Sequence, residues 1–171
     1  VTGVQTCALP IWLGNSCANG GALSSIGVSW TILNSVFSNN TAVGHGANDG
    51  NGGNGGAIYN DGNTMAHQLC GTLMENNRAN EGGSAIFFVS NDRSGTIAIT
   101  DSTLRKNPKG KFETPGFPGL YVLAKGPPTV TNSTIERSAS VAGRVSPRSL
   151  HVSGSLAKVR LLHLTSMEAD R

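Results

Sequence analysis

One phrase occurs four times in this sequence, and it constrains the fold more than any other feature. A Ser or Thr is followed two positions later by an apolar residue, and in the clearest copies an asparagine follows after three more positions. The copies occupy residues 34–40, 71–77, 101–107 and, in a looser form, 132–138. A second phrase, two glycines before a short apolar run, occurs at residues 20–23, 55–59 and 82–87. Self-similarity with a period of about 20–50 residues is typical of stacked repeat proteins.

The segments between the turns have the composition of short strands. Residues 31–33, 35–37, 96–100 and 129–131 are rich in β-branched and apolar side chains. Asn-Asn, Asn-Asp-Gly and Gly-Gly elements follow, and these residues tolerate the left-handed backbone that sharp corners need. No segment between residues 14 and 136 shows helical periodicity. We therefore predict an all-β solenoid of about four coils, a truncated piece of a longer repeat array.

If each repeat is one coil, equivalent residues stack at strand spacing, about 4.8 Å. The apolar position of the phrase then forms a core column of four side chains, Phe37, Met74, Leu104 and Ile135. A second apolar column consists of Leu23, Ile58, Ile86 and Leu120. The asparagine position predicts a structural ladder at one corner, made of Asn40, Asn77 and Asn107. Stacked amides of this kind can bond from rung to rung, as in cross-β structures.

Together, the motifs Gly-Gly-Ala-Ile/Leu and Ser/Thr-x-Phe/Met/Leu-x-x-Asn resemble a known family of repeats. They are similar to right-handed parallel β-helix proteins of the pectin-lyase-like superfamily, especially the chlamydial-type polymorphic outer-membrane proteins. The similarity covers residues 19–136, and the last repeat departs from it because Ser138 replaces the asparagine. The resemblance implies a right-handed parallel β-helix that is secreted or displayed on the bacterial outer membrane. It also implies a structural or adhesive role, with surface glycans or host-surface proteins as partners.

The two ends of the sequence do not carry the repeat. Residues 1–11 resemble the translation of a sequencing-library adapter, so we exclude them from the fold. Residues 14–137 hold the β-helix repeats. Residues 138–171 contain no asparagine and several arginines, and they are either an atypical cap or a frame-shifted tail.

Composition excludes several classes of partner. The net charge is +3 and only 13% of residues are charged, without the clustered basic face that nucleic-acid binders show. We therefore expect no nucleic-acid partner. No apolar stretch is long enough to span a membrane, so we also expect no transmembrane segment. Open coil ends present unpaired strand edges, which predict self-association.

Catalytic groups do not follow the repeat. Glycoside hydrolases need two carboxyl groups about 5–9 Å apart. The candidate carboxylates here are Asp61, Glu75, Glu81, Asp92 and Asp101. They do not recur at one phase, so we predict no catalytic residue, no metal site and no cofactor. The alternative is a fragment of a carbohydrate-active enzyme, either a polysaccharide lyase or a glycosidase.

The remaining polar and aromatic residues leave alternatives open. The Gly/Asn-rich loop at residues 44–56 has one carboxylate, Asp49, which is too few for calcium. Cys17 and Cys70 either form a disulfide or stay free, and His45 and His67 lack the spacing of zinc ligands. Several aromatic residues either fill the core or offer rings for sugar stacking, namely Trp30, Phe87, Phe88, Phe112, Phe117 and Tyr121.

Overall fold

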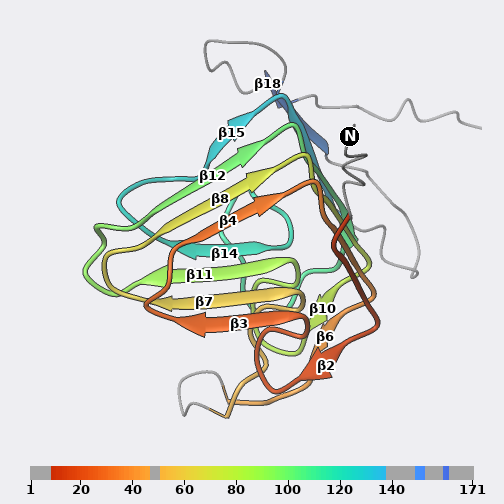
Figure 1. Cartoon of the computed structure of the whole chain (residues 1–171), viewed down its shortest axis with the longest axis vertical. Coiled ribbons are helices and arrows are strands. Elements are labelled where there is room, and N and C mark those ends of the chain that lie inside the picture. Colours follow the sequence, from red (N-terminus) through yellow and green to blue (C-terminus); the bar gives the residue numbers. More distant parts are fainter. Residues whose placement is uncertain (1–8, 47–50, 138–148, 153–159, 162–171) are drawn as a thin grey trace, which may run out of the picture.

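The chain winds into a parallel β-helix in which each repeat is one coil (Figure 1). The computed structural model describes residues 9–46, 51–137, 149–152 and 160–161. These residues form short strands and no helix. The first coil contains β1 (Ile11–Leu13), β2 (Ser16–Cys17), β3 (Leu23–Ile26) and β4 (Trp30–Leu33). The second contains β5 (Val36–Ser38), β6 (Thr41–Ala42), β7 (Ile58–Gly62) and β8 (Ala66–Cys70).

The later coils repeat this order of strands. The third contains β9 (Leu73–Glu75), β10 (Arg78–Ala79), β11 (Ile86–Ser90) and β12 (Thr96–Thr100). The fourth contains β13 (Thr103–Asn107), β14 (Leu120–Leu123) and β15 (Thr129–Thr131), with residues 108–119 in place of the short second strand. After it come β16 (Ser133–Arg137), β17 (Ser149–Val152) and β18 (Arg160–Leu161).

Equivalent strands of successive coils pair to form four sheets. Sheet A has the order β1-β5-β9-β13-β16-β17-β18, and sheet B has the order β10-β6-β2. Sheet C has the order β14-β11-β7-β3, and sheet D has the order β15-β12-β8-β4. All pairs up to β16 are parallel, whereas β17 and β18 add to sheet A in antiparallel orientation. This arrangement confirms the predicted all-β parallel solenoid of about four coils.

The corners explain why the phrase uses asparagine, glycine and aspartate. Asn34, Gly71, Asp101 and Asn132 each precede a strand of sheet A and have φ angles of 46°, 61°, 48° and 46°. These residue types reach the left-handed region at the lowest steric cost. A second left-handed position, before the asparagine of each phrase, is held by Asn39, Asn76 and Lys106.

The second glycine of the other phrase is required by close packing between coils. A Cβ atom on Gly56 would lie 2.1 Å from the carbonyl oxygen of Ser84, far inside van der Waals contact. Gly21 is in the same position one coil earlier, with the oxygen of Gly56 at 2.3 Å. In the third coil the glycine pair is shifted by one residue, because Ile86 pairs with Ile58 and so Ser84 takes the place of Gly56.

The core is a set of columns inside the coils. Phe37, Met74, Leu104 and Ile135 in sheet A are all 0% exposed. Sheet C contributes Ile58, Ile86 and Leu120, and sheet D contributes Ile32, Leu69 and Ile99. Trp12 lies above Phe37 with ring centroids 4.5 Å apart and planes inclined by 4°.

The two terminal segments lie largely outside the described residues. Residues 1–8 lie outside the described residues, whereas Ile11 pairs with Val36 at the start of β1. Most of residues 138–171 also lie outside the described part, and the backbones of β17 and β18 extend sheet A beyond β16. The origins predicted for the two terminal segments stay predictions.

Candidate functional site

The asparagines of the phrase lie at the corner where sheet A turns into sheet B. Oδ1 of Asn77 accepts hydrogen bonds from the backbone N and Nδ2 of Asn40, at 3.0 and 2.9 Å. Oδ1 of Asn107 accepts the same pair from Asn77, at 3.0 and 3.1 Å. Nδ2 of Asn77 also donates to the backbone oxygen of Phe37, and that of Asn107 to the oxygen of Met74. These amides are at most 1% exposed, so their bonds satisfy groups that would be costly to bury alone.

Sequence reasoning missed a further rung, Asn15. Its backbone N and Nδ2 donate to Oδ1 of Asn40 at 3.0 and 2.9 Å. The sequence does contain a pattern that predicts this rung, because Trp12 precedes Asn15 at the same spacing as Phe37 precedes Asn40. We use the name asparagine ladder for Asn15, Asn40, Asn77 and Asn107.

A second ladder, also missed, uses the hydroxyl at the start of the phrase. Oγ of Ser102 accepts a hydrogen bond from the backbone N of Thr72 at 3.1 Å. Oγ of Ser133 accepts one from the backbone N of Ser102 at 3.0 Å. The residues are at most 3% exposed, and each hydroxyl also donates to a backbone oxygen two residues earlier. The Ser or Thr of the phrase therefore joins the coils at the corner between sheets D and A.

The five candidate carboxylates each bond to a residue one coil away. Glu75 pairs with Arg105 at 2.9 Å, and Glu81 pairs with Lys111 at 2.8 Å. Asp61 accepts from Nδ2 of Asn91, Asp92 from Oγ1 of Thr64, and Asp101 from Nδ2 of Asn132. The groups lie on different sheets and corners, and each one ties neighbouring coils together.

Hydrogen bonds lower the pKa of two of these carboxylates, which favours their charged form. Hydrogen bonds from Lys111 and from the backbone N of Gly46 lower the pKa of Glu81. Hydrogen bonds from the backbone N of Ser94, and from the hydroxyls of Ser90 and Ser94, lower the pKa of Asp92 to about 2. A carboxyl group that acts as a general acid needs a raised pKa, because it must hold its proton near neutral pH.

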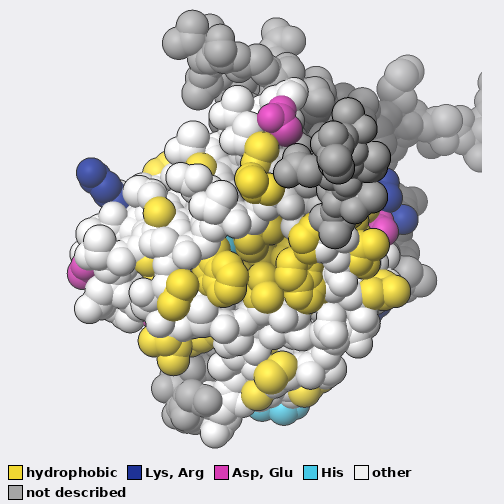
Figure 2. Space-filling view, viewed as in Figure 1, with side chains coloured by type: hydrophobic (Ala, Val, Ile, Leu, Met, Phe, Trp, Pro, Cys, Tyr) yellow, Lys and Arg dark blue, Asp and Glu magenta, His cyan; other side chains and the backbone are white. Residues whose placement is uncertain are grey.

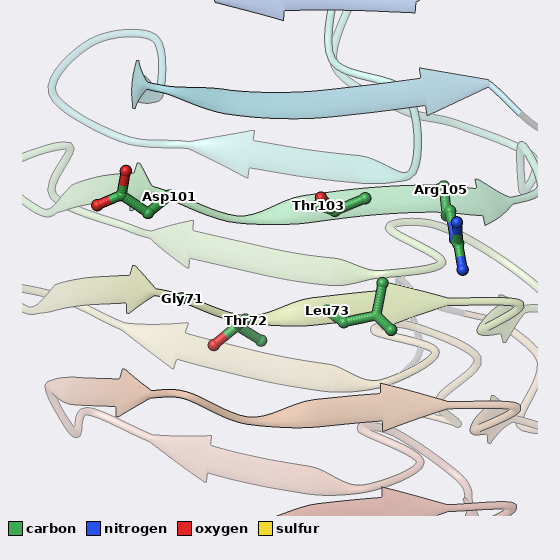
Figure 3. A pocket seen from close by; sticks show the side chains of 6 residues that line it. All are labelled: Gly71, Thr72, Leu73, Asp101, Thr103 and Arg105. Atoms are coloured by element: carbon green, nitrogen blue, oxygen red, sulfur yellow. The ribbon is translucent and has the colours of Figure 1, made fainter. Parts of the chain in front are cut away.

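A groove of about 330 Å³ opens on the outer face of sheet A between β9 and β13 (Figure 3). It is lined by Gly71, Thr72, Leu73, Asp101, Thr103 and Arg105. Asp101 and Arg105 lie at opposite ends, with Thr103 between them. The side chain of Arg105 is 43% exposed even though it pairs with Glu75. The groove therefore offers a carboxylate, a guanidinium and a hydroxyl group, which suit hydrogen bonding to a polar ligand.

Aromatic rings stack on the outer face of sheet C, one from each of three successive coils. The centroids of Tyr59 and Phe87 are 5.2 Å apart with planes inclined by 10°, and those of Phe87 and Tyr121 are 5.0 Å apart at 24°. Phe112 packs edge-on against Tyr121 at 4.8 Å. Both faces of Phe87 are covered by these neighbours, so its ring cannot stack on a sugar. Phe88, the next residue, points into the core and is 0% exposed.

Other candidate ligands remain apart. Cys17 in β2 and Cys70 in β8 are free thiols on different sheets. His67 is 0% exposed, and neither ring nitrogen has a hydrogen-bond partner among the described residues. In the described part of the chain, no group of three or more His, Cys, Asp or Glu side chains could hold a metal ion. No helix among the described residues is long and apolar enough to cross a membrane.

Comparison with known proteins gives one family match. The profile of the Chlamydia polymorphic membrane protein repeat matches residues 34–61. This segment runs from the first complete copy of the phrase, through β5 and β6, into β7. No curated protein and no solved structure gives a significant match. The match agrees with the resemblance that the two phrases carry.

Proposed function

We propose that the chain is part of a β-helix displayed on a bacterial cell surface, with a structural and adhesive role. Its location is supported by the match to a repeat of polymorphic membrane proteins. The structural role is carried by one observation: all five candidate carboxylates bond to a neighbouring coil. Charged groups that an enzyme would use for chemistry here bond to neighbouring coils.

The groove on sheet A is the contact site in this proposal, and its ligand is a surface glycan. Sugar hydroxyls donate and accept hydrogen bonds, which matches the mixed set formed by Asp101, Thr103 and Arg105. The open, shallow form of the groove suits recognition along a chain of sugars, with modest affinity for each unit. A host-surface protein is the competing ligand class.

The test is binding of the purified chain to an array of bacterial and host glycans. Arg105→Gln removes the guanidinium at one end of the groove and should reduce binding at least fivefold. Arg93→Gln is the matched control, because Arg93 is exposed in the turn between β11 and β12, away from the groove. Binding to no glycan, or an equal loss with Arg93→Gln, would contradict the assignment of the groove. Binding to host-surface proteins alone would favour the competing ligand class.

A further inference from the structure

Most of the Lys and Arg side chains that the structure describes gather where sheet A turns into sheet B. They come from the third and fourth coils, and we call them the basic corner: Arg78, Arg105, Lys106, Lys109 and Lys111. The other two described cations, Arg93 and Lys125, lie in the turns between sheets C and D. In the view of Figure 2, Lys and Arg side chains lie at the margins of the molecule, with none in the middle of the face.

The fourth coil packs on the third so that these residues share one corner. Nζ of Lys111 donates to the carboxylate of Glu81 at 2.8 Å, and the next backbone N donates to the carbonyl oxygen of Glu81 at 3.3 Å. Residues 108–119 therefore run beside the end of the third coil's β10, which holds Arg78. Lys106 lies near the end of β13, just before this segment.

Two of the five positive charges are paired and three are not. Arg105 and Lys111 each form an ion pair with a carboxylate of the third coil, at 2.9 and 2.8 Å. The other three side chains are exposed and form no hydrogen bond or ion pair with a described residue, namely Arg78, Lys106 and Lys109. Unpaired like charges at one place repel each other and raise the local concentration of anions.

The basic corner continues the groove on sheet A. Arg105 lines the end of the groove that lies opposite Asp101 (Figure 3). Strand β13 leads from Thr103 in the groove to Lys106 at the corner, a distance of about 10 Å at the rise of a strand. An extended molecule that lies along the groove toward Arg105 therefore meets further positive charge beyond it.

The surroundings of the corner decide between classes of anionic partner. Binding to a membrane surface also uses apolar side chains, but the large apolar residues that are exposed in the described chain all lie at residues 9–43. Single-stranded nucleic acid needs free aromatic rings for base stacking. Both rings of residues 108–119 are occupied, because Phe112 packs against Phe87 and Tyr121, and Phe117 packs against the core. A sugar chain with acidic groups needs only charge and hydrogen bonds.

We propose that the glycan of the proposed function is a polyanion whose carboxylate or sulfate groups bind at the basic corner. The inference rests on the proposed function for the class of ligand. The guanidinium of Arg78 can bind two anionic oxygens in parallel, whereas the ammonium groups of Lys106 and Lys109 act as point charges. The groove supplies the hydrogen bonds to the hydroxyl groups of the same chain.

The test is biolayer interferometry of the purified chain on immobilised dextran sulfate and on dextran of the same length, which differ only in the sulfate groups. The chain should bind dextran sulfate about tenfold more tightly or better. Raising NaCl from 50 to 200 mM should weaken this binding by about tenfold or more, because about three ionic contacts release counterions. In a second arm, polygalacturonate replaces dextran sulfate and shows whether the corner prefers carboxylate or sulfate groups.

Two double variants separate the corner from overall charge. Lys106→Gln with Lys109→Gln should weaken binding to dextran sulfate by about tenfold. Arg93→Gln with Lys125→Gln is the matched control, because it removes two exposed charges away from the corner. Lys106 and Arg93 have φ angles of 55° and 58°, so glutamine meets the same backbone constraint in both variants. Thermal unfolding checks that both variants remain folded.

Three results would overturn the proposal. Equal affinity for dextran and dextran sulfate would leave the groove as a site for neutral glycans, so the proposed function would stand alone. Equal losses in the two double variants would show attraction to overall positive charge without a site. Tighter binding to vesicles of anionic phospholipid, or to single-stranded DNA, would assign the corner to another class of partner. Conversely, loss of binding with the corner variant but none with Arg105→Gln would reject the groove and support the corner.

Discussion

His67 is a buried group whose burial should make the protein sensitive to acid. Its ring lies inside the coils in β8, between Trp30 and Ile97 on the neighbouring strands of sheet D. It is 0% exposed, and the ring of Phe88 meets it edge-on with centroids 6.3 Å apart. Neither nitrogen has a hydrogen-bond partner among the described residues. Replacing it with leucine, of similar size, removes two unsatisfied polar atoms and the titration together.

The magnitude follows from the pKa of the imidazole. Burial lowers the pKa of His67 from 6.5 to about 4, because the charged ring cannot be solvated inside the core. The unfolded chain takes up a proton below pH 6.5 and the folded chain only near pH 4, so stability falls as the pH falls through this window. The loss is about 2 kcal/mol at pH 5 and about 3 kcal/mol at pH 4 and below. Above pH 6.5 this residue has no effect on the pH dependence.

Urea unfolding followed by tryptophan fluorescence at pH 7, 6, 5 and 4 measures the free energy of unfolding and its dependence on pH. At pH 7, His67→Leu should be more stable than the wild type by about 1–2 kcal/mol, since unsatisfied buried polar atoms are removed. Its advantage should grow to about 4–5 kcal/mol at pH 4, because only the wild type loses stability through this histidine. His45→Gln is the control for loss of a histidine at an exposed position. Parallel curves for His67→Leu and the wild type would refute the reasoning.

Three further predictions concern the contacts between coils. Asn77→Ala should lower the free energy of unfolding by about 3 kcal/mol, because it leaves buried donors of Asn40 without an acceptor; urea unfolding at pH 7 measures it, and a loss below about 1 kcal/mol would argue against the ladder. Gly56→Ala should cost about 3 kcal/mol or more, because its Cβ would lie 2.1 Å from an oxygen of Ser84, whereas Gly126→Ala, with open space around it, should be nearly neutral in the same assay. Arg105→Gln should change stability by at most about 1 kcal/mol in thermal unfolding, since its ion pair with Glu75 is partly exposed, and a larger loss would show that solvent does not screen this contact between coils.

Most of the fold could be predicted because the physical cause of each feature is local and recurs. The runs at residues 31–33, 96–100 and 129–131 are β-branched, and they lie in β4, β12 and β15. Asparagine and glycine mark the corners, where the backbone takes positive φ angles. What could not be predicted is which residue of the third coil stands at the second glycine position. Ser84 takes the place of a second glycine because strand pairing, rather than the glycine pair itself, aligns the third coil.

Fewer of the polar contacts could be predicted from the sequence. Asn15 was missed because its copy of the phrase keeps only Trp12 and the asparagine, without the Ser or Thr. The hydroxyl ladder was missed because a Ser or Thr before a strand has many uses, and only the stacking brings Thr72 against Ser102. The sheet A groove depends on which outward side chains of adjacent coils stand together, such as Leu73 and Thr103. The repeated phrase places these two residues at one phase, but no local pattern shows that the outward side chains around them leave a groove.

The stacking of Phe37, Met74 and Leu104 in register is the central claim about this molecule. Its most direct test is a nuclear Overhauser spectrum of isotopically labelled protein, read at the methyl group of Met74. Neighbouring strands lie about 4.8 Å apart, so this methyl should show contacts to the ring of Phe37 and to the methyls of Leu104. Phe37 and Leu104, two strands apart, should show only weak contacts or none. Absence of both Met74 contacts, or strong direct contacts between Phe37 and Leu104, would contradict the parallel β-helix described above.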